Sequence, residues 1–213
     1  TADNTTQLSL ISTDTDANTG PVFVLWRNSA NSADGDNTGK IAFQGEDDAG
    51  NKTTYSTIDT FISDNTNGTE DGQLALKTVV AGTERHRINM KSAETVINDD
   101  SVDLDFRVES NGNANMLFVD GGENRIGIGT NAPATDVHIQ KSSATAILRL
   151  HRTGATNAAN AALGQLEFFN ADGTGDGPNV TSKIVGSTFT STGAGGNLEF
   201  YTHDSSESGG EGS

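Results

Sequence analysis

The sequence predicts an all-β protein, and three observations lead to that prediction. Apolar residues recur at every second position in runs such as DLDFRVES (103–110), which is the period of a strand with one buried face. Clusters of Asn, Asp, Gly, Ser and Thr, residues typical of turns, separate these runs. No stretch has a convincing helical period. The Ala-rich segment 155–165 remains open between a short helix and a small-residue loop.

The composition predicts a thin hydrophobic core. The chain has 213 residues, of which 32% are hydrophobic, and its formal net charge is −16. This balance approaches that of disordered chains, but the regular alternation argues against disorder for most of the sequence. We therefore expect the missing apolar burial to come from other subunits. The first few residues and the segment 205–213 are expected to be frayed ends.

Two segments of the sequence repeat each other. The triplet Leu25-Trp26-Arg27 recurs as Leu150-His151-Arg152, 125 positions later, and 39–43 matches 164–168 at the same offset. Repeats of this kind build arrays in which each unit buries its apolar face against a neighbour. We therefore expect two copies of one β module.

The repeat divides the chain into four expected parts. Residues 1–19 would end a preceding module or linker, and 20–90 would form the first module. Residues 91–142 would form a linking β segment, and 143–213 an incomplete second module in a chain that continues. Phe43 and Phe168 are expected at equivalent buried sites, as are Leu76 and Phe200.

The linking segment contains the run RIGIGTNAP (125–133), in which Ile126 and Ile128 alternate with Gly127 and Gly129. Glycine inside a strand loses backbone entropy on folding and packs nothing, so its regular placement needs a reason. A strand face made of glycine lets another backbone approach closely. The alternative is a β-bulge or a sharp twist within one chain.

The run NRIGIGTNAPATDVHI (124–139) resembles a motif common in tail fibre and tailspike proteins of tailed bacteriophages, and that motif also occurs in some bacterial surface proteins. The segments 103–130 and 25–58 resemble the stretches that flank the motif in those fibres. The resemblance implies an elongated, intertwined homotrimer built from β-sandwich or β-prism-like modules. Ile126 and Ile128 would then pack into the module core, and Gly127 and Gly129 would face a neighbouring strand near the threefold axis. Trp26 is a further candidate for packing between chains, with a glycan-binding surface as its alternative.

The expected function is that of a structural fibre segment in a virion appendage, a phage tail fibre that projects or forms a host-receptor-binding adhesin. Its expected partners are copies of itself, other virion tail proteins, and a glycan or protein of the host surface. One alternative is a bacterial or archaeal cell-surface adhesin or filament subunit. The other is a polysaccharide depolymerase tailspike, for which Asp103 and Asp105 would supply two carboxylates on one strand face. Because the chain has only one Trp and two Tyr as sugar platforms, we expect no enzyme.

Charge and motifs exclude several other classes of function. The 29 acidic residues outnumber the 13 basic ones, which disfavours binding to nucleic acid or to an anionic membrane. No apolar stretch is long enough for a membrane-spanning helix, so we expect no membrane insertion. Asp47, Asp48, Asp172 and Asp176 are candidate calcium ligands, because clustered carboxylates bind Ca²⁺, but they lack EF-hand spacing. They are expected to be acidic turn residues, and neither a metal nor a cofactor is expected.

Overall fold

The computed structural model describes residues 6–153, 158–174, 178–190 and 195–202. The chain divides into two compact units, Thr1–Ser142 and Ser143–Ser213. Strands make up 48% of the described residues and none of these residues is helical, which confirms the all-β class. No described helix is long and apolar enough to cross a membrane.

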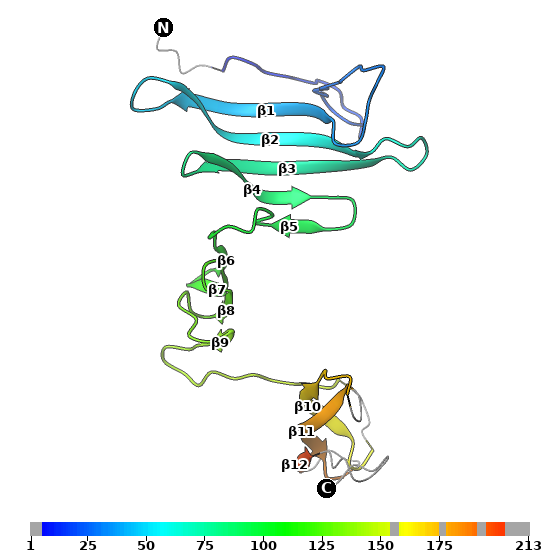
Figure 1. Cartoon of the computed structure of the whole chain (residues 1–213), viewed down its shortest axis with the longest axis vertical. Coiled ribbons are helices and arrows are strands. Elements are labelled where there is room, and N and C mark those ends of the chain that lie inside the picture. Colours follow the sequence, from blue (N-terminus) through cyan, green and yellow to red (C-terminus); the bar gives the residue numbers. More distant parts are fainter. Residues whose placement is uncertain (1–5, 154–157, 175–177, 191–194, 203–213) are drawn as a thin grey trace. The chain divides into compact units, whose positions relative to one another are not determined.

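The first sheet is an antiparallel meander whose five strands lie side by side in sequence order (Figure 1). Its strands are β1 (Asn37–Glu46), β2 (Lys52–Asp64), β3 (Asp71–Val80), β4 (Thr83–Met90) and β5 (Thr95–Ile97). Tight turns fit this arrangement, because antiparallel neighbours need only short connections. The sheet extends past position 90, where the sequence predicted the end of the first module, because β5 pairs with β4.

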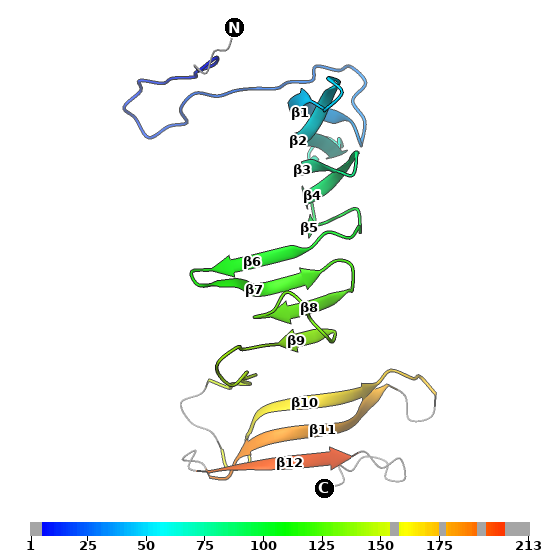
Figure 2. The same ribbon diagram turned by 90° about the vertical axis from the view of Figure 1, so that its left-hand side faces the viewer.

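The second sheet, also in the first unit, holds the RIGIGTNAP run (Figure 2). Its strands are β6 (Phe106–Ser110), β7 (Asn113–Asp120), β8 (Arg125–Ile128) and β9 (Val137–Ile139). The pair β8–β9 is parallel, although only residues 129–136 join the two strands. A parallel pair usually needs a connection of about a dozen residues or more, so this crossover is unusually short.

The third sheet lies in the second unit. Its antiparallel strands are β10 (Ala162–Asn170), β11 (Asn179–Thr188) and β12 (Gly196–Thr202). Ala162–Gln165, which the sequence left open between a helix and a loop, belongs to β10. Its pairing with β11 outweighs the helical propensity of the alanines, because tertiary context overrides intrinsic preference.

The β1–β2 and β10–β11 pairs share their irregularities. Register shifts interrupt β1 between Asn37 and Gly39 and after Phe43. They interrupt β10 between Ala162 and Gly164 and after Phe168. The corresponding positions are 125 residues apart, which is the offset of the sequence repeat.

Phe43 and Phe168 occupy matching positions at these shifts, but they are not buried as the sequence predicted. Their exposed fractions are 53% and 55%. Leu76 and Phe200 also match, since they pair with Ile58 and Ile184. Leu76 is half-buried because β4 flanks it, whereas Phe200 lies on an edge strand and is 67% exposed.

The described residues contain almost no hydrophobic core. Only Ala75, Phe118 and Val185 are buried apolar residues, one in each sheet. A second layer of structure is the usual way to bury the apolar face of a sheet. Within the described part of each unit the sheets are single layers (Figures 1 and 2), so most apolar side chains keep contact with solvent.

Candidate functional site

The first sheet carries an apolar row that crosses every strand. The register aligns one residue from each of β1 to β5, and aligned residues point to the same face. The row consists of Ile41, Ile58, Leu76, Ile88 and Ile97. Its two ends, Ile41 and Ile97, are each 40% exposed, so the row is open to solvent.

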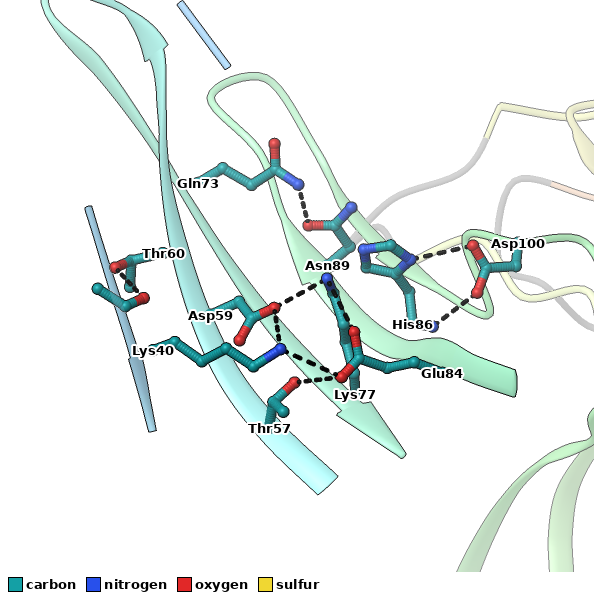
Figure 3. A network of polar contacts seen from close by, with 11 residues as sticks. Lys40, Thr57, Asp59, Thr60, Gln73, Lys77, Glu84, His86, Asn89 and Asp100 are labelled. Carbon is teal, nitrogen blue, oxygen red and sulfur yellow. Dashed lines mark hydrogen bonds and ion pairs between the residues drawn. The ribbon is translucent and has the colours of Figure 1, made fainter. Parts of the chain in front are cut away.

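The opposite face of the same sheet is polar, and most of its charged side chains pair with one another (Figure 3). Lys77 Nζ lies 2.9 Å from Asp59 Oδ2 and 3.6 Å from Glu84 Oε2. Lys40 Nζ lies 3.6 Å and 3.4 Å from the same two side chains, and Thr57 donates to Glu84 Oε1 over 3.3 Å. Lys40 and Lys77 thus neutralise Asp59 and Glu84. Asp59 is only 3% exposed. Asp59 Oδ1 has no hydrogen-bond partner among the described residues.

A second polar chain continues along this face. Gln73 Nε2 donates to Asn89 Oδ1 over 2.7 Å, and Asn89 Nδ2 donates to Asp99 Oδ2 over 2.7 Å. Lys91 Nζ donates to the other oxygen of Asp99 over 2.9 Å. The hydrogen bond from Lys91 and that from Asn89 hold the pKa of Asp99 below its ordinary value. Asn89 is fully buried, and both of its amide atoms are paired within the chain.

Asp100 binds His86 at two atoms (Figure 3). The His86 backbone N–H donates to Asp100 Oδ2 over 2.7 Å, and the ring Nδ1 lies 3.0 Å from Oδ1. The side-chain contact, and then the backbone hydrogen bond, lower the pKa of Asp100. The carboxylate therefore fixes the turn after β5 against β4.

The second sheet has an apolar row of the same kind. Phe106, Val119, Ile126 and Val137 align across its four strands. Their exposed fractions are 36%, 37%, 39% and 58%. Ile128 extends the same face and is 41% exposed. The sequence predicted that Ile126 and Ile128 pack into the module core of an assembled homotrimer. In the single chain both side chains are partly exposed.

The chain covers the glycine face of β8 with its own backbone. A Cβ on Gly127 would stand 2.3 Å from the backbone oxygen of Thr130, and one on Gly129 would stand 2.2 Å from that of Gln140. Gly129 also has a φ of +83°, a left-handed conformation that favours glycine. The close backbone approach predicted at these glycines is present, but the approaching backbone is the chain's own crossover. This crossover covers the face that also carries the buried Phe118.

The crossover is held in place by its own hydrogen bonds. Ile126 N–H donates to Asp136 O, and Gln140 N–H donates to Ile128 O, each over 2.8 Å. Arg125 Nη1 donates to the carbonyl of the buried Pro133 over 3.1 Å. The motif therefore folds as a short parallel crossover that requires glycine within one chain.

The third sheet repeats the division into an apolar and a polar face. Leu166, Ile184 and Phe200 align across its strands, and Leu166 and Phe200 are 48% and 67% exposed. On the other face, Lys183 Nζ lies 4.7 Å from the centre of the Tyr201 ring. Tyr201 also donates to Glu199. All three sheets thus present one apolar face that the described residues leave open.

The acidic metal candidates lie in turns. Asp47 Oδ1 accepts the backbone N–H groups of Ala49 and Asn51 over 3.0 and 2.8 Å. Asp172 Oδ1 accepts the backbone N–H of Thr174 over 2.9 Å. Asp48 is exposed, and Asp176 lies outside the described residues. In the described part of the chain, no three His, Cys, Asp or Glu side chains gather where they could share a metal ion.

The carboxylates considered for a glycosidase do not share a strand face, contrary to the sequence-based expectation. Asp103 and Asp105 precede β6 and lie outside it. Asp105 Oδ1 accepts the backbone N–H of Gly121 over 3.0 Å, so it fixes the turn after β7.

The polar network around Asp59 was missed in the sequence. Lys40, Asp59 and Lys77 each stand next to a member of the apolar row, so the alternation assigns them to the opposite face. Their mutual contact depends on which residues pair across strands. The register shift that brings Lys77 opposite His86 has no signal in the sequence.

We expect Gly127→Ala to lower the free energy of unfolding by about 1–3 kcal/mol, because the added methyl group overlaps a backbone oxygen that cannot rotate away. The loss should be independent of protein concentration, since the overlap lies within one chain. Thermal and urea denaturation at two concentrations measure it. Gly72→Ala is the matched control, because its nearest atom is the Phe61 oxygen at 3.9 Å. A loss that grew with dilution would restore the inter-chain explanation.

We expect acid to destabilise the first sheet. The pKa of Asp99 and of Asp100 is lower in the folded chain than the ordinary value of 3.8. Their stabilising effect is therefore complete above that value and is lost as the pH falls through the folded pKa. Urea denaturation at a series of pH values should show a smaller acid loss in Asp100→Asn than in the wild type. Asp48→Asn, at an exposed turn position, should keep the wild-type loss; an unchanged loss in Asp100→Asn would contradict the assignment.

Comparison with known proteins adds no relative, since no protein-family model and no curated protein matches the sequence.

Proposed function

We propose that the chain is a structural segment of an extracellular fibre, in which copies of the chain cover one another's apolar sheet faces. One observation carries this proposal: each of the three sheets aligns apolar residues in a row that the described residues leave partly exposed. Apolar surface is stabilised by removal from water, at roughly 25 cal/mol per Å². A second copy of the chain carries the same uncharged rows, so the rows of two copies can cover each other.

The surface area of the chain supports burial between copies. The accessible surface is 15745 Å² for a 22.1 kDa chain. Two compact domains that share this mass in the ratio of the two units would expose about 11,000 Å² by the usual scaling. The difference of about 4,700 Å² far exceeds the roughly 800 Å² per partner that a standard interface buries.

The charge distribution also favours contact through these faces. With a net charge of −16, copies of the chain repel one another at any contact that brings their carboxylates together. The row of Ile41, Ile58, Leu76, Ile88 and Ile97 contains no charged residue. The lysines and carboxylates of the first sheet lie on the other face. Packing through the apolar rows therefore keeps like charges apart.

The number of copies and the kind of appendage rest on the resemblance of 124–139 to phage tail fibres. It favours a homotrimer in a virion tail fibre, with three apolar faces enclosing a shared core. The matching strand order and register shifts of β1–β3 and β10–β12 support the proposal that both derive from one repeated module. A repeated module suits a spacer that holds a receptor-binding part away from its base.

Light scattering of the purified chain tests the proposal, and a homotrimer has three times the mass of the 22.1 kDa chain. We expect Leu166→Thr, on the apolar face of β10, to raise the dissociation constant about tenfold, because part of a leucine loses its burial. The neighbouring Glu167→Thr places the same residue on the opposite face and should leave the mass unchanged. A wild-type chain that stays monomeric at high concentration, or equal effects of both substitutions, would overturn the proposal.

A further inference from the structure

The segment PVFVLW (21–26) is an apolar run that no sheet of the described chain includes. A continuous apolar run of this length is typical of a strand that is buried on both faces. Yet Val22, Phe23, Val24, Leu25 and Trp26 have exposed fractions of 66%, 61%, 68%, 46% and 78%. Within the described residues, no backbone hydrogen bond involves these five positions. The segment thus has the composition of a buried strand and the environment of a surface loop.

The end of the segment is fixed to the first sheet. A Cβ on Gly39 would lie 3.0 Å from Leu25 Cβ, so Leu25 packs directly over the glycine. Gly39 stands two positions before Ile41, on the same face as the apolar row. Arg27 Nη1 donates to Asn37 O over 3.0 Å, and Arg27 Nη2 lies 3.2 Å from Asp36 Oδ1. The segment is therefore anchored at the apolar face.

The exposed fractions alternate along the segment. Phe23 and Leu25, at 61% and 46%, are less exposed than Val22, Val24 and Trp26, at 66%, 68% and 78%. This period of two is that of an extended chain with one side toward a surface. Leu25 marks the side toward the chain's own sheet, so Val24 and Trp26 belong to the outer side. The apolar side chains of Val24 and Trp26 on this outer side are therefore left uncovered by the described residues.

The second unit provides an internal comparison. Leu150 packs over Gly164 as Leu25 packs over Gly39, and Arg152 Nη1 donates to Ala162 O over 3.3 Å. Leu150 is 47% exposed, against 46% for Leu25. The outer positions differ, because Arg149 and His151 stand where the first unit has Val24 and Trp26. The anchoring is thus common to both units, whereas the outer side of the first is apolar at all three positions and that of the second only at Ile147.

We infer that residues 22–26 form an inter-chain contact strand, packed between the apolar face of their own sheet and a second copy of this chain. The inference rests on the proposed function and goes further, because it names the segment that lies between the copies. Phe23 and Leu25 face the chain's own sheet, and Val22, Val24 and Trp26 meet the second copy. The equivalent segment of the second unit packs on its own sheet only, and its Arg149 and His151 stay in solvent.

A second copy fits this surface better than a ligand of another kind. The outer side offers branched aliphatic side chains and one indole in an uncharged row, which matches the uncharged rows of a second copy. A glycan would need hydrogen-bonding groups beside the indole, and Arg27 is already engaged with Asp36 and Asn37. The backbone N–H and C=O groups of the segment need hydrogen-bond partners once they are buried. In a second copy, β1 can supply them, because it is an edge strand of the described sheet.

The single tryptophan of the chain makes the test specific, because Trp26 reports on this segment alone. The wild-type chain is examined by light scattering together with tryptophan emission and acrylamide quenching, with free N-acetyl-tryptophanamide as the exposed reference. On assembly we expect a blue shift of the emission and a loss of quenching. Assembly with Trp26 quenched as readily as the reference would overturn the inference and leave the proposed function intact. A chain that does not assemble would overturn both.

A matched pair of substitutions separates the contact from a general loss of stability. Val24→Ser should raise the dissociation constant of the assembly about tenfold while the circular dichroism of the dissociated chain is unchanged. Arg149→Ser, at the equivalent position of the second unit, should leave the dissociation constant at its wild-type value. Equal effects of the two substitutions, or no effect of Val24→Ser, would overturn the inference. So would protection of Trp26 by added oligosaccharide without a change in mass.

Discussion

Each sheet of this chain has two faces, and the described residues pair or cover the side chains of only one of them. Lys77 pairs with Asp59 and Glu84 on the polar face of the first sheet, so most of the charge on that face is neutralised within a single chain. The row from Ile41 to Ile97 on the other face has no such cover among the described residues. Anything that binds the folded chain and removes these apolar rows from water therefore adds to the stability of the fold.

The second sheet shows how the chain covers a face when it does so internally. The crossover after β8 runs over Gly127, and two of its own residues, Thr130 and Pro133, are buried. Glycine is required there because a backbone oxygen takes the place of a side chain. The crossover covers the face of β8 that carries Gly127, and Ile126 lies on the opposite, uncovered face. The same motif thus explains both the absence of side chains at the glycines and the exposure of the isoleucines.

The sequence predicted strands well and their surroundings less well, for a physical reason. Alternation along one strand, as in Phe106 and Val108, reveals which residues share a face, since that depends only on local geometry. It does not reveal what covers the face, which is why Phe43 and Ile126 were expected in a core that the single chain lacks. Pairing between strands is likewise invisible, and the contact of Lys40 with Glu84 depends on it.

The parallel pair β8–β9 has a mechanical consequence. In an antiparallel hairpin the chain enters and leaves at the same end, so a pulling force opens the hydrogen bonds one after another. Here the chain enters at Arg125 and leaves after Ile139, at opposite ends of two strands that run the same way. Tension along the backbone therefore loads the bonds between them in shear, all at once, and the short crossover has little slack to release. A spacer that carries load would have, in this small sheet, a clamp that resists extension.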